Sequence, residues 1–115
     1  MSVALMPQEN WSIVRAQAAQ LIFTFATVQG ITGWALRFRL NKVDGTAVLT
    51  KTTAGGSITI TDATNGVFKV ALAVADTSTL DEKDYIYDVW RTDSGAEACL
   101  ARGKGTLVQP MANLG

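Results

Sequence analysis

Large apolar side chains alternate with polar ones in several short stretches of the chain. In the stretch 34–40, four apolar positions beginning with Trp34 alternate with Ala35, Arg37 and Arg39. A period of two places successive side chains on opposite faces of a β-strand. This stretch therefore predicts a strand with Trp34 on the core face and two cations on the other face. Similar stretches, each predicting a strand, are found at 20–28, 57–61, 67–72, 85–90 and 98–108.

Short turn signals separate these stretches. Asp44-Gly45 lies between the stretches 34–43 and 47–52, and an Asp-Gly pair in that position is a strong signal for a β-hairpin. Gly55-Gly56, Asn65-Gly66 and 93–95 mark further reversals of the chain. About seven or eight short strands with turns at this spacing predict an all-β fold, an antiparallel β-sandwich or small barrel, and we favour the sandwich.

Three segments are harder to assign. Residues 10–20 contain good helix formers, yet Trp11, Ile13 and Arg15 alternate, so strand, extended arm and helix all stay open, with strand or arm favoured. In 75–83, Asp76 is placed as the N-cap of a single helical turn. Gly103 and Gly105 predict a bulge or a break in the last strand.

The chain reads as one domain with two short ends. We expect an N-terminal arm at 1–10, the β-sandwich at 11–110 and a C-terminal tail at 111–115, because the two ends lack periodicity. Met1 to Met6 is apolar, but Pro7 and Glu9 interrupt it before a signal-peptide core forms. No stretch reaches 18 apolar residues, so we expect no membrane span and synthesis in the cytoplasm.

Composition narrows the classes of function. The 115 residues contain 10 Lys and Arg against 10 Asp and Glu, no His and one Cys. A neutral chain lacks the cationic excess that drives broad binding to nucleic acid or anionic lipid, so neither is an expected partner. Charged residues make up 17% of the chain, below the roughly 25% typical of soluble domains. We interpret this as a sign that another protein covers part of the surface.

Residues that could carry chemistry are few. Without His, a nucleophile has no imidazole base, and Cys99 lies in an apolar strand, where a packed thiol is expected. The acidic group Asp81, Glu82 and Asp84 is expected to be a solvated turn. Residues 103–106 resemble the end of a phosphate-binding loop, but the upstream glycine is missing. We therefore predict no enzyme activity, no cofactor and no metal site.

Arginines are the first candidates for partner binding. Arg37 and Arg39 lie on the outer face of their predicted strand, and Arg91 and Arg102 could share that face. Such a ladder could bind an acidic partner surface. It could equally pair with Asp88 or Glu97 across strands.

The second group of candidates for partner binding consists of the tryptophans and the N-terminal arm. Trp90 lies on the face of Ile86 and Asp88, so it is the best single candidate for an interface anchor, and it could also stack on sugar rings. The arm could dock on a neighbouring protein through its apolar residues. The full set of predicted partner-binding residues is Trp90, Arg37, Arg39, Trp11, Leu5 and Met6.

One segment carries a resemblance to a known class of fold. Residues 80–89, Leu-Asp-Glu-Lys-Asp-Tyr-Ile-Tyr-Asp-Val, look like the corner before strand F of immunoglobulin-like sandwiches. There a Leu packs under the turn and a Tyr hydroxyl bonds to the backbone, which implies these roles for Leu80 and Tyr85. The corner usually has Gly two residues before the Tyr, whereas this chain has Lys83. A positive φ would cost Lys about 1 kcal/mol, so a different corner is expected.

The order of motifs along residues 11–109 extends the resemblance. These motifs are 31–34 opening a strand that ends in 37–40, then 65–68, 85–89, and 100–103 with a closing strand to Val108. Their order is similar to that of the immunoglobulin-like N-terminal domain of phage upper baseplate proteins and of many small phage tail and virion proteins. The resemblance implies an immunoglobulin-like β-sandwich and a non-enzymatic virion structural protein.

What the resemblance implies about function is assembly. A tail, baseplate or fibre-attachment subunit is expected, and the alternatives are a capsid decoration or head-fibre protein and a carbohydrate- or host-surface-binding module. The expected partners are other virion proteins and further copies of the chain in a symmetric assembly. The expected location is the virion, after synthesis in the host cytoplasm.

Overall fold

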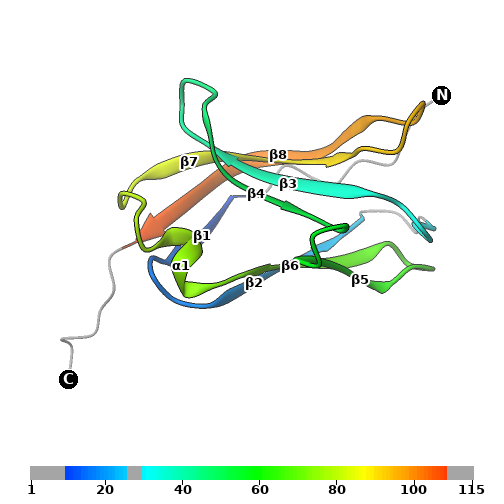
Figure 1. Cartoon of the computed structure of the whole chain (residues 1–115), viewed down its shortest axis with the longest axis horizontal. Helices are drawn as coiled ribbons and strands as arrows, with labels where there is room; N and C mark the ends of the chain where they lie inside the picture. The colour runs from blue at the N-terminus through cyan, green and yellow to red at the C-terminus, as the bar shows by residue number, and fades with distance from the viewer. Residues whose placement is uncertain (1–9, 26–29, 109–115) are drawn as a thin grey trace.

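The computed structural model describes residues 10–25 and 30–108 and consists mostly of β-strands (Figure 1). Within these ranges no helix is long and apolar enough to cross a membrane. The elements are β1 (Trp11–Val14), β2 (Ala19–Thr24), β3 (Leu36–Asn41), β4 (Ala47–Thr52), β5 (Ile58–Asp62), β6 (Val67–Leu72), α1 (Val74–Thr77), β7 (Asp84–Arg91) and β8 (Ala98–Val108).

The strands form two sheets that face each other as the two layers of a sandwich (Figure 1). One sheet has five strands in the order β1-β8-β7-β3-β4, and the other has three in the order β2-β6-β5. The prediction of an all-β sandwich is thus confirmed. One pairing departs from the antiparallel expectation, because β1 runs parallel to β8, with Trp11 opposite Gly105.

The core lies between the inner faces of the two sheets. Phe38 on β3 and Val89 on β7 are fully buried, as are Phe68 and Val70 on β6. These are the apolar members of the period-two stretches, so the alternation places the core correctly. Trp34 is only half-buried: it packs against the core, stands edge-on to Phe25, and stacks beneath the Arg91 guanidinium at 4.0 Å.

Three of the four predicted turns close hairpins. The Asp44-Gly45 turn joins β3 to β4, Asn65-Gly66 joins β5 to β6, and 93–95 joins β7 to β8. Gly45, Gly66 and Gly95 each have a positive φ, which glycine adopts without a steric cost. Gly55-Gly56 instead lies where the chain crosses from β4 in one sheet to β5 in the other.

The first segment resolves into two strands. Residues 11–14 form β1, a turn follows, and β2 begins at Ala19, so the strand interpretation of 10–20 is confirmed for its first part. Trp11 packs against Phe38 and Tyr87, with ring centroids 6.2 and 5.5 Å apart. A Cβ on Gly105 would come within 2.5 Å of the Trp11 ring, so this glycine makes room for the indole.

The predicted bulge or break at Gly103 and Gly105 is wrong. Strand β8 runs through both glycines, and the register instead shifts where Val89 pairs with Ala101 but Trp90 pairs with Cys99. The extra residue is Leu100, so Leu100 and its neighbour Ala101 are both buried. Gly105 makes room for Trp11 and does not change the register.

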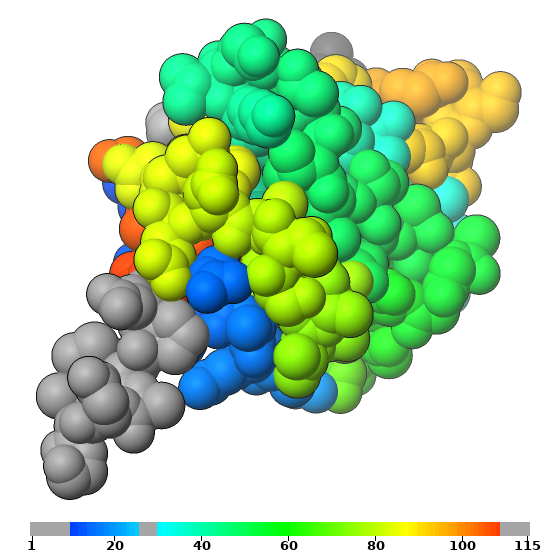
Figure 2. Space-filling model, turned by 60° about the vertical axis from the view of Figure 1, so that its left-hand side comes forward, coloured from blue at the N-terminus to red at the C-terminus, as the bar shows by residue number. Residues whose placement is uncertain are grey.

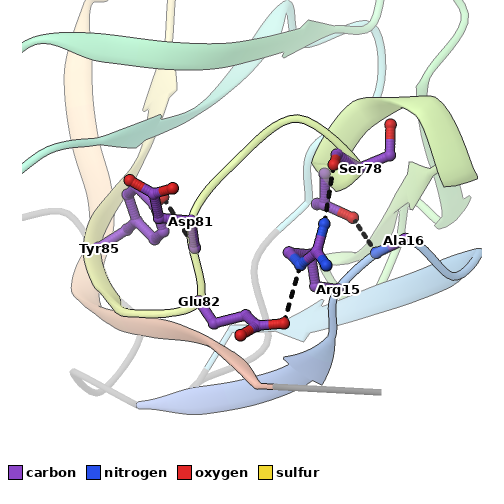
Figure 3. Close-up of polar contacts among 7 residues, drawn as sticks. Arg15, Ala16, Ser78, Asp81, Glu82 and Tyr85 are labelled. Carbon is purple, nitrogen blue, oxygen red and sulfur yellow. Dashed lines mark hydrogen bonds and ion pairs between the residues drawn. The ribbon is translucent and has the colours of Figure 1, made fainter. Parts of the chain in front are cut away.

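The connection from α1 to β7 contains the corner predicted for residues 80–89, called the tyrosine corner below. The Tyr85 hydroxyl donates a hydrogen bond to the Asp81 carbonyl oxygen at 2.9 Å, as drawn in Figure 3, and Leu80 packs against the core. Lys83 does not have a positive φ, so the corner forms here without the glycine conformation. Burial raises the pKa of the Tyr85 hydroxyl, and the nearby Asp81 charge adds to this.

The β1–β2 turn is bound to the same corner, far away in the sequence (Figures 2 and 3). The Arg15 guanidinium donates to the Ser78 carbonyl at 2.8 Å and to the Glu82 carboxylate at 3.1 Å. The Ala16 N–H donates to the hydroxyl of Thr77, which is fully buried, at 2.8 Å. These bonds hold Ala16 at a φ of 63°, in the left-handed region.

The predicted N-cap of the helical turn is wrong by three residues. Ala73 occupies the N-cap position, and Asp76 lies in the third position of α1, where its carboxylate accepts the Ala73 N–H. The same carboxylate pairs with Lys51 Nζ of β4 at 2.8 Å, and both side chains are mostly buried. Asp76 therefore connects the helical turn to the edge of the five-stranded sheet.

Replacing Ala16 with glycine is expected to stabilise the protein. The left-handed conformation costs a residue with a Cβ about 1 kcal/mol, and glycine avoids this cost. Glycine also raises the conformational entropy of the unfolded chain, which offsets part of the gain. The free energy of unfolding in urea should rise by about 0.5 kcal/mol. Ala71→Gly, at an exposed position within β6, is the matched control and should lower it by about 0.5–1 kcal/mol. Equal losses in the two variants would contradict the strain at Ala16.

Replacing Asp76 with asparagine is expected to destabilise the protein in a pH-dependent way. Burial alone would raise the pKa of the Asp76 carboxyl, but hydrogen bonds from Lys51 and Ala73 outweigh it, so this pKa lies below its ordinary 3.8. A lowered folded-state pKa stabilises the protein above pH 3.8, and the stabilisation is lost as the pH falls through the folded-state pKa. Chemical denaturation at pH 7 should show a loss of about 1–2 kcal/mol.

The difference between wild type and Asp76→Asn should shrink when the same measurement is made at about pH 3. Glu97→Gln, which neutralises an exposed carboxylate, is the control and should stay within about 0.5 kcal/mol of wild type at both pH values. A loss of the same size at pH 7 and pH 3 would show that the charge of Asp76 is not the cause.

Candidate interaction surface

The outward side of the five-stranded sheet, called the outer face below, carries three rows of side chains. Residues directly opposite each other on neighbouring strands share a face, so the rows follow from the register. From β4 through β3 and β7 to β8, the rows are Thr52, Arg37, Trp90 and Cys99; then Thr50, Arg39, Asp88 and Arg102; then Ala47, Asn41, Ile86 and Lys104.

The middle row holds one carboxylate between two guanidinium groups. Asp88 Oδ1 pairs with Arg39 Nε at 3.6 Å, and its Oδ2 accepts a hydrogen bond from the Asn41 amide at 2.9 Å. Asn41 is 7% exposed and also donates to the Ile86 carbonyl at 3.1 Å. Asp88 is therefore already bound by Arg39 and Asn41, and among the described residues Arg102 has no carboxylate within ion-pair distance.

The first row places Trp90 beside Arg37. Both side chains are half-buried, and Arg37 Nε is shielded from solvent without a hydrogen-bond partner in the described part of the chain. Cys99, on the other side of Trp90, is half-buried as well, and burial raises the pKa of its thiol, so the reactive thiolate is disfavoured. The row offers an aromatic ring and a guanidinium rather than a nucleophile.

The third row runs through two neighbouring hollows. The turn between β3 and β4 forms one wall of a hollow of about 200 Å³, called the hairpin hollow below. Its lining comprises Lys42, Val43 and Gly45 of the turn and Arg39, Asn41, Ile86, Asp88 and Arg102 of the sheet. A second hollow of about 410 Å³, the β8 hollow, is lined by Asn10, Ile86, Arg102, Gly103 and Lys104. The two share Ile86 and Arg102, so they lie side by side, and Figure 1 shows the β3–β4 turn rising from the sheet.

The structure brings three of the predicted partner-binding residues together on the outer face: Arg37, Arg39 and Trp90. Trp11 instead lies on the inner side, against Phe38 and Tyr87. Its placement there is accounted for by core packing. The remaining two, Leu5 and Met6, lie outside the described residues.

The prediction that Arg91 and Arg102 share the face of Arg37 and Arg39 is correct for Arg102 and wrong for Arg91. Arg102 shares the outer face because it pairs with Asp88, and the predicted pairing of Arg39 with Asp88 is found. Arg91 pairs with Leu36, whose side chain points inward, and its guanidinium stacks on Trp34 and binds Asp93 at 2.8 Å. Arg91 follows Trp90 directly in the strand, so alternation alone places the two on opposite faces.

The sequence did not predict that Asn41, Ile86 and Lys104 line hollows on this surface. Asn41 continues the alternation of Arg37 and Arg39, so its position on the outer face was predictable. Its burial was not, because that depends on the β3–β4 turn folding over the sheet. The hollows have no signal in the sequence, because they are formed by residues from three strands and a turn.

The acidic residues of the corner do not converge. Asp81, Glu82 and Asp84 are all exposed; Glu82 pairs with Arg15, and Asp84 pairs with Lys104 at 3.7 Å. Within the described residues no group of three or more Asp, Glu, His or Cys side chains could hold a metal ion. The outer face is therefore the surface on which aromatic, aliphatic and cationic groups are gathered.

Replacing Asn41 with alanine is expected to destabilise the protein and loosen the middle row. The substitution leaves the Ile86 carbonyl and Asp88 Oδ2 without their amide donor, and the loss in free energy of unfolding should be about 1–2 kcal/mol. Urea denaturation measures it. Thr50→Ala, an exposed position on the same face, is the control and should change the value by less than about 0.5 kcal/mol. A loss from Asn41→Ala no larger than that of the control would contradict the role of this amide.

No protein-family model matches the chain, and no curated protein matches it significantly. The function proposed next rests on the outer face and on the order of the strands.

Proposed function

We propose that this protein is a non-enzymatic structural component of a bacteriophage particle and acts by binding neighbouring virion proteins. The observation that supports binding to neighbouring proteins is the composition of the outer face, and the phage assignment follows from the resemblance of the motifs along residues 11–109. Trp90, Ile86 and the arginines Arg37, Arg39 and Arg102 are grouped there, and none of them is needed to fill the core. Trp and Arg are the residue types that most often dominate the binding energy of protein interfaces.

The order of the strands supports the immunoglobulin-like part of the proposal. In immunoglobulin variable-type domains strands C′, C, F and G share one sheet, and strands B, E and D lie in the other. If β2 to β8 are taken in sequence as B, C, C′, D, E, F and G, the observed orders β8-β7-β3-β4 and β2-β6-β5 follow that scheme. The hydrogen bond from Tyr85 to Asp81 adds the corner that precedes strand F in such domains.

The arrangement on the outer face suits a protein interface for a physical reason. Trp90 and Ile86 are half-buried, so a partner can cover their remaining apolar surface without rearranging the sheet. Arg37 and Arg39 beside them are held in extended strands, and little conformational entropy of the backbone is lost on binding. The β-strands thus present a rigid surface on which the charged middle row lies between Trp90 in the first row and Ile86 in the third.

Assembly in many copies would strengthen a modest contact. A face of this kind, repeated by the symmetry of a particle, turns each later contact into an intramolecular one. A tail, baseplate or fibre-attachment position is our first proposal, and capsid decoration or head-fibre attachment uses the same mechanism. The location that follows is the virion, after synthesis in the host cytoplasm.

Replacing Trp90 with alanine is expected to reduce incorporation into particles. Truncating an aromatic anchor typically costs an interface about 2 kcal/mol or more, which is roughly a 30-fold loss of affinity. Phage particles would be purified on a density gradient from cells that produce both the wild-type and variant chains, and quantitative mass spectrometry would give their ratio. Ile22→Ser, which changes a side chain that is 69% exposed on the other sheet, is the matched control.

The expected ratio of variant to wild type is well below one for Trp90→Ala and near one for Ile22→Ser. Absence of the wild-type protein from purified particles would overturn the proposed function. Binding of the purified protein to immobilised glycans, lost in Trp90→Ala, would instead favour the carbohydrate-binding alternative.

A further inference from the structure

We propose that the hairpin hollow and the β8 hollow together form a docking site for an acidic segment of a partner protein, with Arg102 at its centre. This inference rests on the proposed function, because it names the chemistry of the partner that the outer face binds. The observations behind it are the lining of the two hollows, the pairing of their charges and the position of Arg102 between them.

The lining of the hollows is cationic although the whole chain is neutral. The described lining has four cationic residues, which are Arg39, Lys42, Arg102 and Lys104. Against them it has one carboxylate, that of Asp88. The chain as a whole has 10 cationic and 10 acidic side chains. The hollows are therefore a local concentration of positive charge, which favours a ligand of opposite sign.

Within the described ranges, two of the four cations have a carboxylate partner and two do not. Arg39 pairs with Asp88, and Lys104 pairs with Asp84 outside the hollows. Among the residues that the structure describes, Lys42 and Arg102 have no carboxylate within ion-pair distance. Arg102 is exposed and lines both hollows, so one carboxylate from either side can reach its guanidinium.

The shape of the site sets the form of the ligand. From β3 to β8 the site spans two strand spacings, which is about 10 Å. An extended segment advances about 3.3 Å per residue and its side chains alternate in direction, so carboxylates two or four residues apart, about 7 or 13 Å, face the same side and bracket this span. Ile86 lies between the hollows and offers an apolar contact to the segment as it crosses.

A protein carboxylate fits this site better than a nucleic acid backbone. Nucleic acid binding draws its affinity from a continuous track of Lys and Arg that neutralises many phosphates. Here Asp88 lies in the floor of the hairpin hollow, and Ile86 interrupts the positive charge. Isolated cations beside an apolar residue match side-chain carboxylates that are spaced along a peptide.

Binding of a defined acidic peptide tests the proposal. Acetylated hexaglutamate would be titrated into the ¹⁵N-labelled full chain at low and at about 0.3 M salt, and amide chemical shifts would be followed. We expect the changes to concentrate at 42–45, 86 and 102–104 and the affinity to fall with salt. Arg102→Glu should weaken binding by about tenfold, and Arg102→Gln by less.

The matched control is Lys69→Glu, which makes the same change of charge on the outward side of the three-stranded sheet, where Lys69 pairs with Ile22 and Thr59. At 0.3 M salt it should change the affinity by less than about twofold, because it lies on the opposite face of the sandwich and the Debye length is then below about 8 Å. Thermal unfolding checks that all variants remain folded. Equal weakening by Lys69→Glu and Arg102→Glu, or shift changes spread over both sheets, would overturn the site.

Two further outcomes keep this inference separate from the proposed function. If a thymidine decanucleotide binds the same residues more tightly than hexaglutamate, the ligand is a phosphate backbone and the acidic-peptide site is wrong. If Arg102→Glu enters particles as well as wild type while Trp90→Ala does not, the virion role stands and the acidic segment is wrong. If hexaglutamate binds as expected but the protein is absent from particles, the site stands and the virion role fails.

Discussion

The packing of Phe23 against the opposite sheet is the contact on which the rest of the structure depends. Phe23 on β2 contacts Phe38 and Tyr87 of the five-stranded sheet, at ring-centroid distances of 6.3 and 5.9 Å, and Phe68 beside it at 5.3 Å. These contacts fix which side of each strand faces inward. Because side chains alternate, a shift of one residue in any pairing would reverse the faces. The outer face, with Trp90 and its arginines, is thus a direct consequence of the core.

The end of the sandwich at the tyrosine corner is closed by a second set of contacts. Strand β1 belongs to the five-stranded sheet and β2 to the three-stranded sheet, so the short turn between them must cross the edge of the sandwich. The hydrogen bonds of Arg15 to Ser78 and Glu82, and of the Ala16 N–H to Thr77, satisfy polar groups at this crossing. Their cost is the left-handed conformation of Ala16. This strain lies at the one non-glycine residue of the described chain that has a positive φ.

The fold was largely predictable because its signals are local. Alternation located the buried positions of β2, β3, β6 and β7, and glycine-containing turns located three hairpins, since both depend on neighbouring residues. The predictions that were wrong concern features that depend on residues far away in the sequence. The parallel pairing of β1 requires β8, the bulge at Leu100 is set by the pairing with β7, and Gly105 makes room for the Trp11 ring. Asp76 also was assigned to the wrong helical position because its other partner, Lys51, lies on β4.

The candidate surface was predictable in its residue types but not in its charge pairing. Alternation is enough to place Arg37 and Arg39 on one face, yet it cannot say which cation Asp88 binds. In the structure Asn41 holds one carboxylate oxygen of Asp88, and Arg39 pairs with the other. Within the described part of the chain, Arg102 is thereby left without a carboxylate partner, although it lies opposite Asp88 in the register. On a neutral chain, such unpaired cations give little long-range attraction and act only over short distances. They are therefore suited to fixing the orientation of a partner that is already in contact, which is the requirement of ordered assembly.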